Sequence, residues 1–102
     1  MSAMAEHAMV INVSRYRPAA GKRQELMSEM KRMAERAAGS KGCFGAQACE
    51  SDRDREDLVA ISRWESAQAL QAFSDAAEAA VEREHLEGLV AGPAQRENLR
   101  PA

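Results

Sequence analysis

The apolar residues of this chain repeat with two different periods, and the order of these periods constrains the fold more strongly than any other feature of the sequence. From residue 8 to residue 17 they alternate, which is the period of a β-strand with two unlike faces. One face is aliphatic and carries Met9, Ile11 and Val13. The other face is mixed and carries Asn12, Ser14 and Tyr16. Pro18 ends this strand because proline lacks a backbone N–H, and Gly21 permits the turn that follows.

Between residues 22 and 38 the period lengthens to 3.6, which predicts an amphipathic helix. Its apolar stripe consists of Leu26, Met30, Met33 and Ala37, with Met27 and Ala34 beside it. We interpret the methionines as core residues rather than ligands of a cofactor, because they recur at the spacing of a buried helix face. Gly39 and Gly42 stand where a helix end and a turn back into the sheet belong.

The middle of the chain predicts a hairpin. Strands are expected from Cys43 to Glu50 and from Leu58 to Glu65, and the charged residues 51–57 are interpreted as the solvated tip between them. The second of these strands also has two faces: Val59 and Ile61 on one, and Leu58, Ala60, Ser62 and Trp64 on the other.

A second helical segment follows, with Ser66 as its N-cap. Its expected apolar stripe is Leu70, Phe73, Ala77 and Val81. Asp75 and Glu78 have the spacing of a capping box, so we expect the helix to break and restart there. Gly92-Pro93 is expected to end the helix, and residues 94–100 are assigned to a last strand mainly because the preceding elements need a closing partner.

This order of elements predicts an α+β fold, a ferredoxin-like βαββαβ domain with an antiparallel sheet, over residues 8–102. Residues 1–7 are expected to form a flexible N-terminal tail. In such a domain both helices cover one face of the sheet. We expect the other face to carry Val10, Tyr16, Leu58, Ala60 and Trp64. That face is too apolar for water, so a second copy is expected to pack against it in a homodimer.

The composition excludes several classes of partner. The formal net charge is -2 and aromatic residues make up 4% of the chain, so neither a basic surface nor a set of stacking rings for nucleic acid is present. No apolar run approaches the roughly 20 residues of a membrane span. The N-terminus has neither the basic start nor the apolar core of a signal peptide. We therefore expect a cytoplasmic protein that binds neither nucleic acid nor membranes.

The two cysteines, Cys43 and Cys49, are expected to be free thiols. On one strand they would lie about 20 Å apart, at about 3.3 Å per residue. A disulfide requires Cα atoms within about 7 Å of each other. No further Cys and no clustered His completes a zinc site, so no metal is expected.

Four segments of the chain carry a resemblance to a known family. They are RPAAGKRQEL (17–26), GSKGCFGAQACES (39–51), LVAISRWESAQALQAF (58–73) and GLVAGP (88–93). The most specific part is Trp64-Glu65-Ser66 followed by Ala69-Leu70. With these segments the chain resembles the antibiotic biosynthesis monooxygenase family. The resemblance implies a dimeric α/β barrel, in which two ferredoxin-like copies associate, and it covers nearly the whole chain.

The mixed strand face supplies the candidate site. We expect a cavity lined by this face and roofed by the second helix, with a small aromatic ligand inside. The candidate catalytic residues are Asn12 and Trp64 as hydrogen-bond donors and His85 as a base. The candidate substrate-binding residues are Tyr16, Ser14, Ser62 and Phe73. Simpler roles stay open: packing for Trp64, a bond to nearby backbone for Asn12, and a surface position for His85.

The resemblance allows two sets of family residues to be compared with this chain. Haem-degrading members have a strand-one Asn near Asn12, but Phe73 stands where they have Trp, and Glu82 stands at or near their haem-ligating His. Polyketide-oxidising members use a Trp that Trp64 matches. Ala60 and Leu70 replace the Asn and Tyr that accompany it.

The resemblance therefore implies a cofactor-independent monooxygenase that oxidises a small aromatic phenol, hydroquinone or polyketide-type substrate with O₂, without metal or flavin. The alternative is a non-catalytic dimer of the same fold that binds a small ligand, which the missing Asn and Tyr favour. A third interpretation is haem binding or haem degradation. Phe73 and Glu82 disfavour it, because a glutamate is a poor substitute for an imidazole ligand of haem iron.

Overall fold

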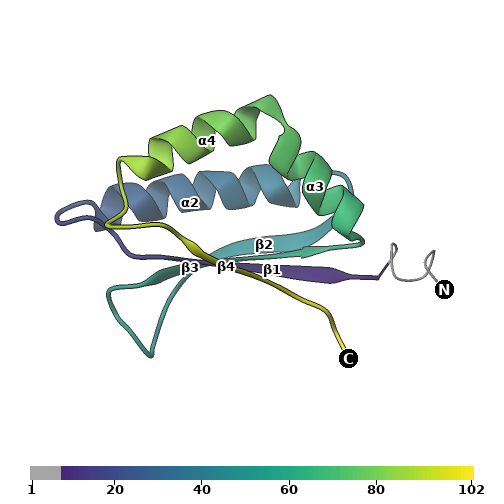
Figure 1. Cartoon of the computed structure of the whole chain (residues 1–102), viewed down its shortest axis with the longest axis horizontal. Helices are drawn as coiled ribbons and strands as arrows, with labels where there is room; N and C mark the ends of the chain where they lie inside the picture. Colours follow the sequence, from purple (N-terminus) through teal and green to yellow (C-terminus); the bar gives the residue numbers. More distant parts are fainter. Residues whose placement is uncertain (1–7) are drawn as a thin grey trace.

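Four antiparallel strands form one sheet, and three helices cover one of its faces, in the computed structural model, which describes residues 8–102 (Figure 1). The elements in chain order are β1 (Val10–Tyr16), α2 (Arg23–Ala38), β2 (Cys43–Glu50), β3 (Leu58–Trp64), α3 (Ala67–Asp75), α4 (Ala77–Glu87) and β4 (Gln95–Leu99). The strand order is β2-β3-β1-β4. The ferredoxin-like α+β fold is confirmed, with the order βαββααβ. The expected tail, residues 1–7, lies outside the described residues.

The closing strand β4 confirms the strand expected at residues 94–100. It pairs antiparallel with β1, with Asn98 opposite Asn12 and Arg96 opposite Ser14. This ladder satisfies the backbone groups on the edge of β1 that faces away from β3. All residues of β4 are exposed, which explains why the strand has no hydrophobic pattern in the sequence.

The sheet turns its mixed face, not its aliphatic face, toward the helices. Val10 pairs with Trp64 and Tyr16 pairs with Leu58, and all four side chains are buried. The prediction that Val10, Tyr16, Leu58, Ala60 and Trp64 lie on the uncovered face is therefore wrong. Trp64 and Tyr16 are the largest side chains of the sheet, so placing them under the helices removes the most apolar surface from water.

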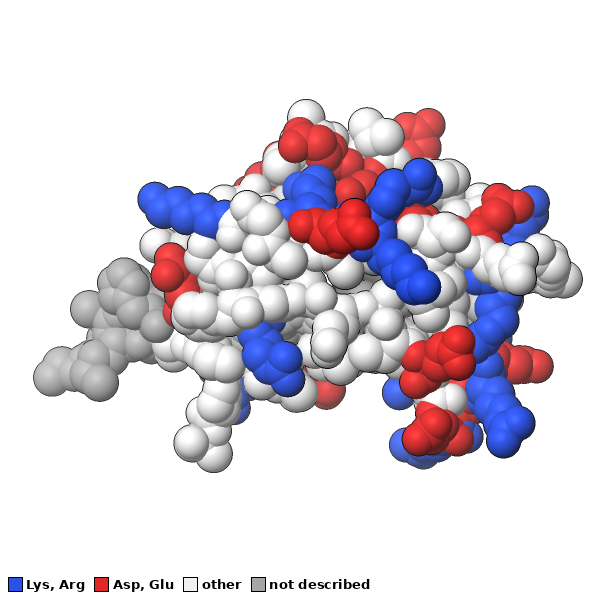
Figure 2. All heavy atoms as spheres, turned by 180° about the vertical axis from the view of Figure 1, so that it is seen from behind, with Lys and Arg blue, Asp and Glu red and all other residues white. Residues whose placement is uncertain are grey.

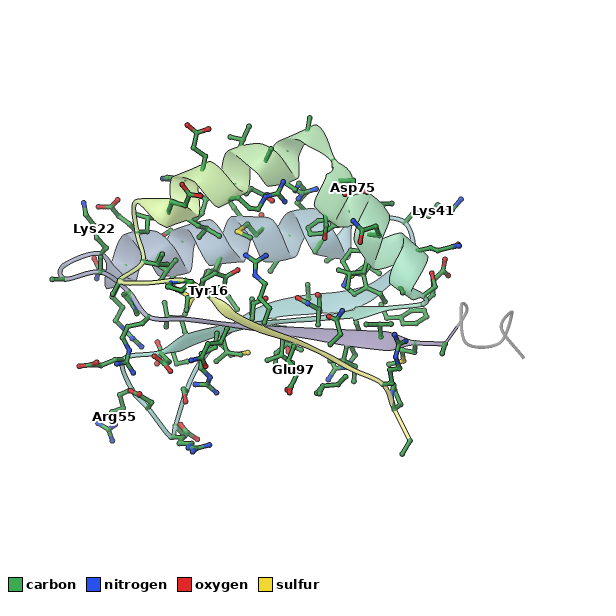
Figure 3. The ribbon with its side chains drawn as sticks, in the orientation of Figure 1. Tyr16, Lys22, Lys41, Arg55, Asp75 and Glu97 are labelled. Atoms are coloured by element: carbon green, nitrogen blue, oxygen red, sulfur yellow. The ribbon has the colours of Figure 1, made fainter. Side chains whose placement is uncertain are left out.

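The other face of the sheet carries the aliphatic residues and points away from the helices. Figure 3 shows Tyr16 on the helix side of the sheet and Glu97, which pairs with Val13, on the other side. The aliphatic side chains of this uncovered face are Ile11, Val13, Val59, Ile61 and Leu99. In Figure 2 the charged side chains gather over the helices and around the β2–β3 hairpin, and the band between them is mostly uncharged.

The helix-facing side of the sheet is apolar at both ends and polar in the middle. The ends are closed by the buried pairs Tyr16–Leu58 and Val10–Trp64. Between them, Asn12 pairs with Ser62 and Ser14 pairs with Ala60. These small and polar side chains do not fill the space under the helices, so a hollow remains in the middle.

Helix α2 packs on the sheet through its predicted stripe. Leu26, Met30 and Ala37 are buried, and Met27 and Met33 pack against the same core. The methionines are thus core residues, as expected. Gly42 makes the turn after this helix with φ +82, and a Cβ added there would lie 2.7 Å from the Cβ of Ala69. The turn accordingly requires glycine both for its backbone conformation and for the close approach of α3.

The second helical segment breaks where the sequence predicts, but a different residue makes the break. Ala76 is extended (φ -62, ψ 149) and caps both α3 and α4, with no side-chain hydrogen bond to α4. Asp75 instead accepts a hydrogen bond from Gln71 within α3. The expected capping box of Asp75 and Glu78 is therefore wrong. Ser66 is confirmed as the N-cap of α3, accepting from the backbone N–H of Ala69.

The break resets the rotation of the helix. Val81, expected in the apolar stripe, is 68% exposed, whereas Ala79 and Leu86 face inward. Helix α4 also ends at Glu87, before the expected Gly92-Pro93 stop. The segment after it runs beside the start of the β1–α2 turn, where Ala19 N–H donates to the carbonyl of Leu89.

Cys43 and Cys49 are both free, as expected. In the described part of the chain, none of the helices combines the length and the apolar character that crossing a membrane requires.

Candidate functional site

The hollow in the middle of the sheet is a cavity of about 340 Å³. It lies between β1, β3 and β4 on one side and α3 and α4 on the other. Polar groups come mainly from the strands, and apolar groups come mainly from the helices. The residues that line it and enter the argument are Asn12, Ser14, Tyr16, Ser62, Asn98, Met33, Leu70, Phe73, Glu82, Arg83 and Arg96. A smaller hollow of about 70 Å³ adjoins it on the side of α2.

A chain of side-chain hydrogen bonds crosses the polar floor of the cavity. Ser14 Oγ donates to Asn12 Oδ1 at 3.3 Å, and Asn12 Nδ2 donates to Asn98 Oδ1 at 2.8 Å. Asn98 therefore fixes the orientation of the Asn12 amide. Within residues 8–102, one N–H of Asn12 and both side-chain N–H groups of Asn98 remain available to a ligand.

Trp64 does not reach the cavity itself. Its side chain is fully buried, and its Nε1 donates to Ser62 Oγ at 2.8 Å. Because this oxygen accepts the indole hydrogen bond, the hydroxyl hydrogen of Ser62 points elsewhere and can be donated into the cavity. Trp64 thus acts on the cavity through Ser62.

Phe73 forms a wall of the cavity and is held from two sides. Its ring centroid lies 5.0 Å from that of Trp64, with the planes tilted by 43°. The guanidinium of Arg36 lies 3.9 Å above the Phe73 ring, which is a cation–π contact. Phe73 is therefore held between Trp64 and Arg36 while it also lines the cavity.

Arg36 also forms a two-pronged ion pair with Glu82. Its Nε and Nη2 donate to the two carboxylate oxygens at 2.8 and 2.6 Å. Both side chains are largely buried, and the hydrogen bonds from Arg36 to Glu82 raise the pKa of the guanidinium. The carboxylate of Glu82 is thereby neutralised at the edge of the cavity.

His85 lies away from the cavity. Its Nδ1 is 3.0 Å from Glu29 Oε2, and its side chain is half exposed between α4 and α2. It does not belong to the cavity lining. Among the candidate residues, the structure brings together Asn12, Ser14, Tyr16, Ser62 and Phe73 around one cavity, and it places Trp64 behind Ser62.

The sequence does not predict several polar residues of the cavity, among them Arg83, Arg96 and Asn98. Arg96 and Asn98 lie on the same face of β4, and the alternation of side chains along residues 94–100 predicts that they share a face. The register of β4 against β1 decides which face points inward, and no hydrophobic pattern in β4 specifies that register. Arg83 is placed by the rotation of α4 after the break at Ala76.

The residues of the cavity do not fit haem. Glu82 stands at or near the position that the resemblance assigns to an iron-ligating histidine, and its two oxygens are already bonded to Arg36. Phe73, at the position of the expected tryptophan, lies under the same guanidinium. A carboxylate bound in this way offers no free donor to haem iron.

The sequence model of one family, described as antibiotic biosynthesis monooxygenase, matches residues 9–85. No curated protein matches the chain.

Several solved structures share the fold over nearly the full length of both chains. Rv0793 of Mycobacterium tuberculosis is 22% identical with a TM-score of 0.85, covering 93% of this chain and 96% of that one. A conserved protein of Methanosarcina mazei is 15% identical with a TM-score of 0.86, covering 98% and 99%. A protein of Caulobacter crescentus, described as a candidate antibiotic biosynthesis monooxygenase, is 17% identical with a TM-score of 0.85, covering 99% and 96%. At these identities the likeness shows the fold alone.

The family match is independent of those structural likenesses and extends from the start of β1 to the last turns of α4. It includes every element that builds the cavity except β4. This chain belongs to the antibiotic biosynthesis monooxygenase family.

Proposed function

We propose that this protein is a cofactor-independent monooxygenase that oxidises a small aromatic phenol, hydroquinone or polyketide-type substrate with O₂. The observation that carries the proposal is the composition of the cavity: a polar floor from β1, β3 and β4 faces the apolar side chains of Phe73 and Leu70 on α3. Such a cavity suits a flat ring that bears hydroxyl groups.

The reaction needs no metal or flavin when the substrate itself supplies the electrons. The phenol loses its proton, the phenolate passes one electron to O₂, and the two radicals combine to a peroxide. Where the carbon that carries the peroxide also carries a hydrogen, loss of water leaves a carbonyl. One oxygen atom then enters the product and the other leaves as water.

The polar floor supports this reaction by stabilising negative charge on the substrate oxygen. Ser62 and Asn12 are proposed to donate hydrogen bonds to the phenolate, and the hydroxyl of Tyr16 to orient the ring. Donors held in place before the reaction stabilise developing charge more than water does, because they need no reorganisation. The Asn98 and Trp64 contacts supply that rigidity.

No unpaired base of the described chain projects into the cavity: Glu82 is bonded to Arg36, the side chain of Glu97 points to the uncovered side of the sheet (Figure 3), and His85 lies elsewhere. We therefore propose substrates whose phenol ionises near neutral pH. Arg83 and Arg96 assist this ionisation, since a nearby positive charge lowers the pKa of a phenol.

The test is oxygen uptake with a panel of hydroquinones and hydroxylated anthracene derivatives, with no added metal or flavin. The proposal predicts uptake by the wild type, with slowing of about 10²–10³-fold in Asn12→Ala, the range typical of an oxyanion donor. Ser28→Ala, on the exposed side of α2, is the control and keeps the wild-type rate. Equal rates in wild type and Asn12→Ala would reject the assigned role.

A second candidate function is binding of the same class of ligand without reaction. It is favoured by the absence of a free base in the cavity lining and by Ala60 and Leu70, which are apolar where polyketide-oxidising relatives are expected to be polar. Saturable binding of a hydroxylated aromatic, combined with no oxygen uptake across the panel that binds, would select this function over the oxygenase.

A further inference from the structure

We propose that the ligand of this cavity carries a carboxylate in addition to its aromatic ring, and that Arg83 and Arg96 bind this carboxylate. The inference rests on the function proposed above in one respect, that the cavity under α3 and α4 is the substrate site. It adds the charge of the substrate and the residues that select for it.

The first observation is that two arginines from distant parts of the chain meet at the cavity. Arg96 lies on β4 opposite Ser14, on the helix-facing side of the sheet, and Arg83 lies on α4. Both line the cavity. Among residues 8–102, no carboxylate lies within ion-pair distance of either guanidinium, whereas Arg15, Arg17, Arg32 and Arg36 each have such a partner.

The second observation is that the two carboxylates near the cavity do not cancel this charge. Glu82 is held by two hydrogen bonds from Arg36. Glu97 belongs to the cavity lining, but it pairs with Val13 and its side chain points to the uncovered face of the sheet, away from the helices (Figure 3). The cavity therefore carries two positive charges without counterions from the described chain, which favours an anionic ligand.

The third observation is the position of the arginines between two hollows. A second hollow of about 410 Å³ lies beside the first and is lined by α4 and the segment that leads to β4. The two hollows share Tyr16, Arg83 and Arg96. When an aromatic ring occupies the first hollow, a carboxylate attached to the edge of that ring can lie at the boundary between the two hollows. Both guanidinium groups line this boundary.

The chemistry of these arginines suits a carboxylate better than a neutral hydroxyl. Arg83 Nη1 donates to the carbonyl of Ser74 at 3.1 Å, which holds its guanidinium in place and leaves its other N–H groups free. A guanidinium can donate two parallel hydrogen bonds to a carboxylate, which gives a stronger and more directional contact than a single bond to a hydroxyl.

The test is isothermal titration calorimetry with matched pairs of ligands that differ only in charge. The pairs are anthraquinone-2-carboxylate with 2-(hydroxymethyl)anthraquinone, and 2-naphthoate with 2-naphthalenemethanol. We expect the wild type to bind at least one acid about 10-fold or more tightly than its alcohol, the size expected for a hydrogen bond to a charged group. The preference should weaken as salt is raised, since the arginines are exposed in the free protein.

Variants assign the preference to the two arginines. Arg96→Gln and Arg83→Gln are each expected to weaken binding of the acid about 10-fold and to leave the alcohol unchanged. Arg96→Lys retains the charge and should retain part of the preference, which separates charge from any disturbance of β4. Arg55→Gln removes the same charge at the tip of the β2–β3 hairpin, far from the cavity, and should bind like the wild type (Figure 3).

The outcomes separate this inference from the oxygenase proposal. Equal affinity for acid and alcohol, no binding of either acid, or a preference that survives in the Arg83→Gln, Arg96→Gln double variant would overturn the inference. A protein that oxidises neutral phenols and ignores the carboxylate keeps the oxygenase and loses the inference. A protein that binds the acids through the arginines but consumes no O₂ loses the oxygenase and keeps the ligand class.

Discussion

Ser62 is the residue at which the buried core meets the candidate site. It accepts the hydrogen bond of the Trp64 indole at 2.8 Å and lines the cavity with the rest of its hydroxyl group. Trp64 is therefore a positioning residue in this account, and the donor to the substrate is Ser62.

This division of roles predicts a non-additive pair of variants. Ser62→Ala removes the donor and should slow oxygen uptake by about 10²–10³-fold. Trp64→Phe keeps most of the ring packing and removes the N–H that orients the hydroxyl, so its effect should be smaller. Because both changes act through one hydroxyl, the double variant should be no slower than Ser62→Ala. Steady-state oxygen uptake measures all three, and additive losses would show that Trp64 acts on the substrate independently.

The Arg36–Glu82 pair predicts that the protein does not bind haem tightly. The carboxylate at the position of an iron ligand is already engaged by a guanidinium. Titration with hemin, followed at the Soret band, should give no saturable shift. A sharp shift at one haem per chain that disappears in His85→Ala would contradict this, and would show that His85 leaves Glu29 to ligate iron.

The cavity residues of β1 and β3, and Phe73 of α3, could be predicted from the sequence, whereas those of β4 and Arg83 of α4 could not. Asn12, Ser14, Tyr16 and Ser62 follow from the alternation of strands, because parity alone places them on one face. The orientation of the Trp64 N–H depends on a rotamer and a neighbour, and the position of His85 depends on the rotation of α4, so neither is encoded in parity.

At the scale of elements, the β2–β3 hairpin is anchored to β1 by Asp57. Its two oxygens accept hydrogen bonds from Arg15 and Arg17, each at 3.2 Å. Burial raises the pKa of Asp57, but the hydrogen bonds and charges of Arg17 and Arg15 outweigh it and hold this pKa below its ordinary value of about 3.9.

A lowered pKa in the folded state means that the ionised carboxylate stabilises the fold. This stabilisation is present above about pH 4 and is lost as the pH falls through the folded-state pKa. Thermal melting across the acidic range should show Asp57→Asn less stable than wild type near neutral pH, with the difference shrinking in acid. Asp52→Asn, in the same hairpin but exposed, is the control and should follow the wild type. A difference that persists unchanged in acid would exclude the ion pairs as its cause.

The turn after α2 predicts a second effect on stability. Gly42→Ala combines a φ of +82 with a Cβ placed 2.7 Å from the Cβ of Ala69, so it should destabilise the fold by more than about 1 kcal/mol. Gly21 has a similar φ of +75, and a Cβ added there would meet open space. Gly21→Ala therefore measures the destabilisation caused by the backbone conformation alone. Denaturant unfolding of both variants separates the two terms, and equal losses would show that the contact with α3 relaxes freely.

The order and the type of the elements could be predicted because the two hydrophobic periods are well separated along the chain. The details that differ lie where the pattern is weak. The restart of α4 at Ala76 turns Val81 outward, and β4 is held by its ladder to β1 rather than by apolar side chains. The sequence does not decide which face of β1 packs against the helices, because both faces carry enough apolar surface to be buried.

At the scale of the whole molecule, we propose that the uncovered aliphatic face packs against a second copy. It carries Ile11, Val13, Ile61 and Leu99, with Leu99 42% exposed, and also Val59, which is already buried within one copy. The homodimer predicted from the sequence thus rests on this face instead of the one that contains Trp64. Light scattering should give about twice the monomer mass of 11.1 kDa.

A charge in the middle of that face should separate the copies. Ile61→Glu places a carboxylate at the proposed contact, where burying it without a partner is costly, and should give a monomer. Val81→Glu puts the same charge on the exposed side of α4 and should leave the dimer intact. A wild type that stays monomeric at micromolar concentration would reject both the dimer and the α/β barrel.

The most direct test of the central claim, that the hollow under α3 and α4 is the substrate site, is a crystal structure with a hydroxylated aromatic bound. The ring is expected to lie against Phe73, with one of its hydroxyl oxygens within hydrogen-bond distance of Ser62 or Asn12. Density for the ligand on the uncovered face of the sheet, or anywhere outside the space between the strands and these two helices, would contradict it.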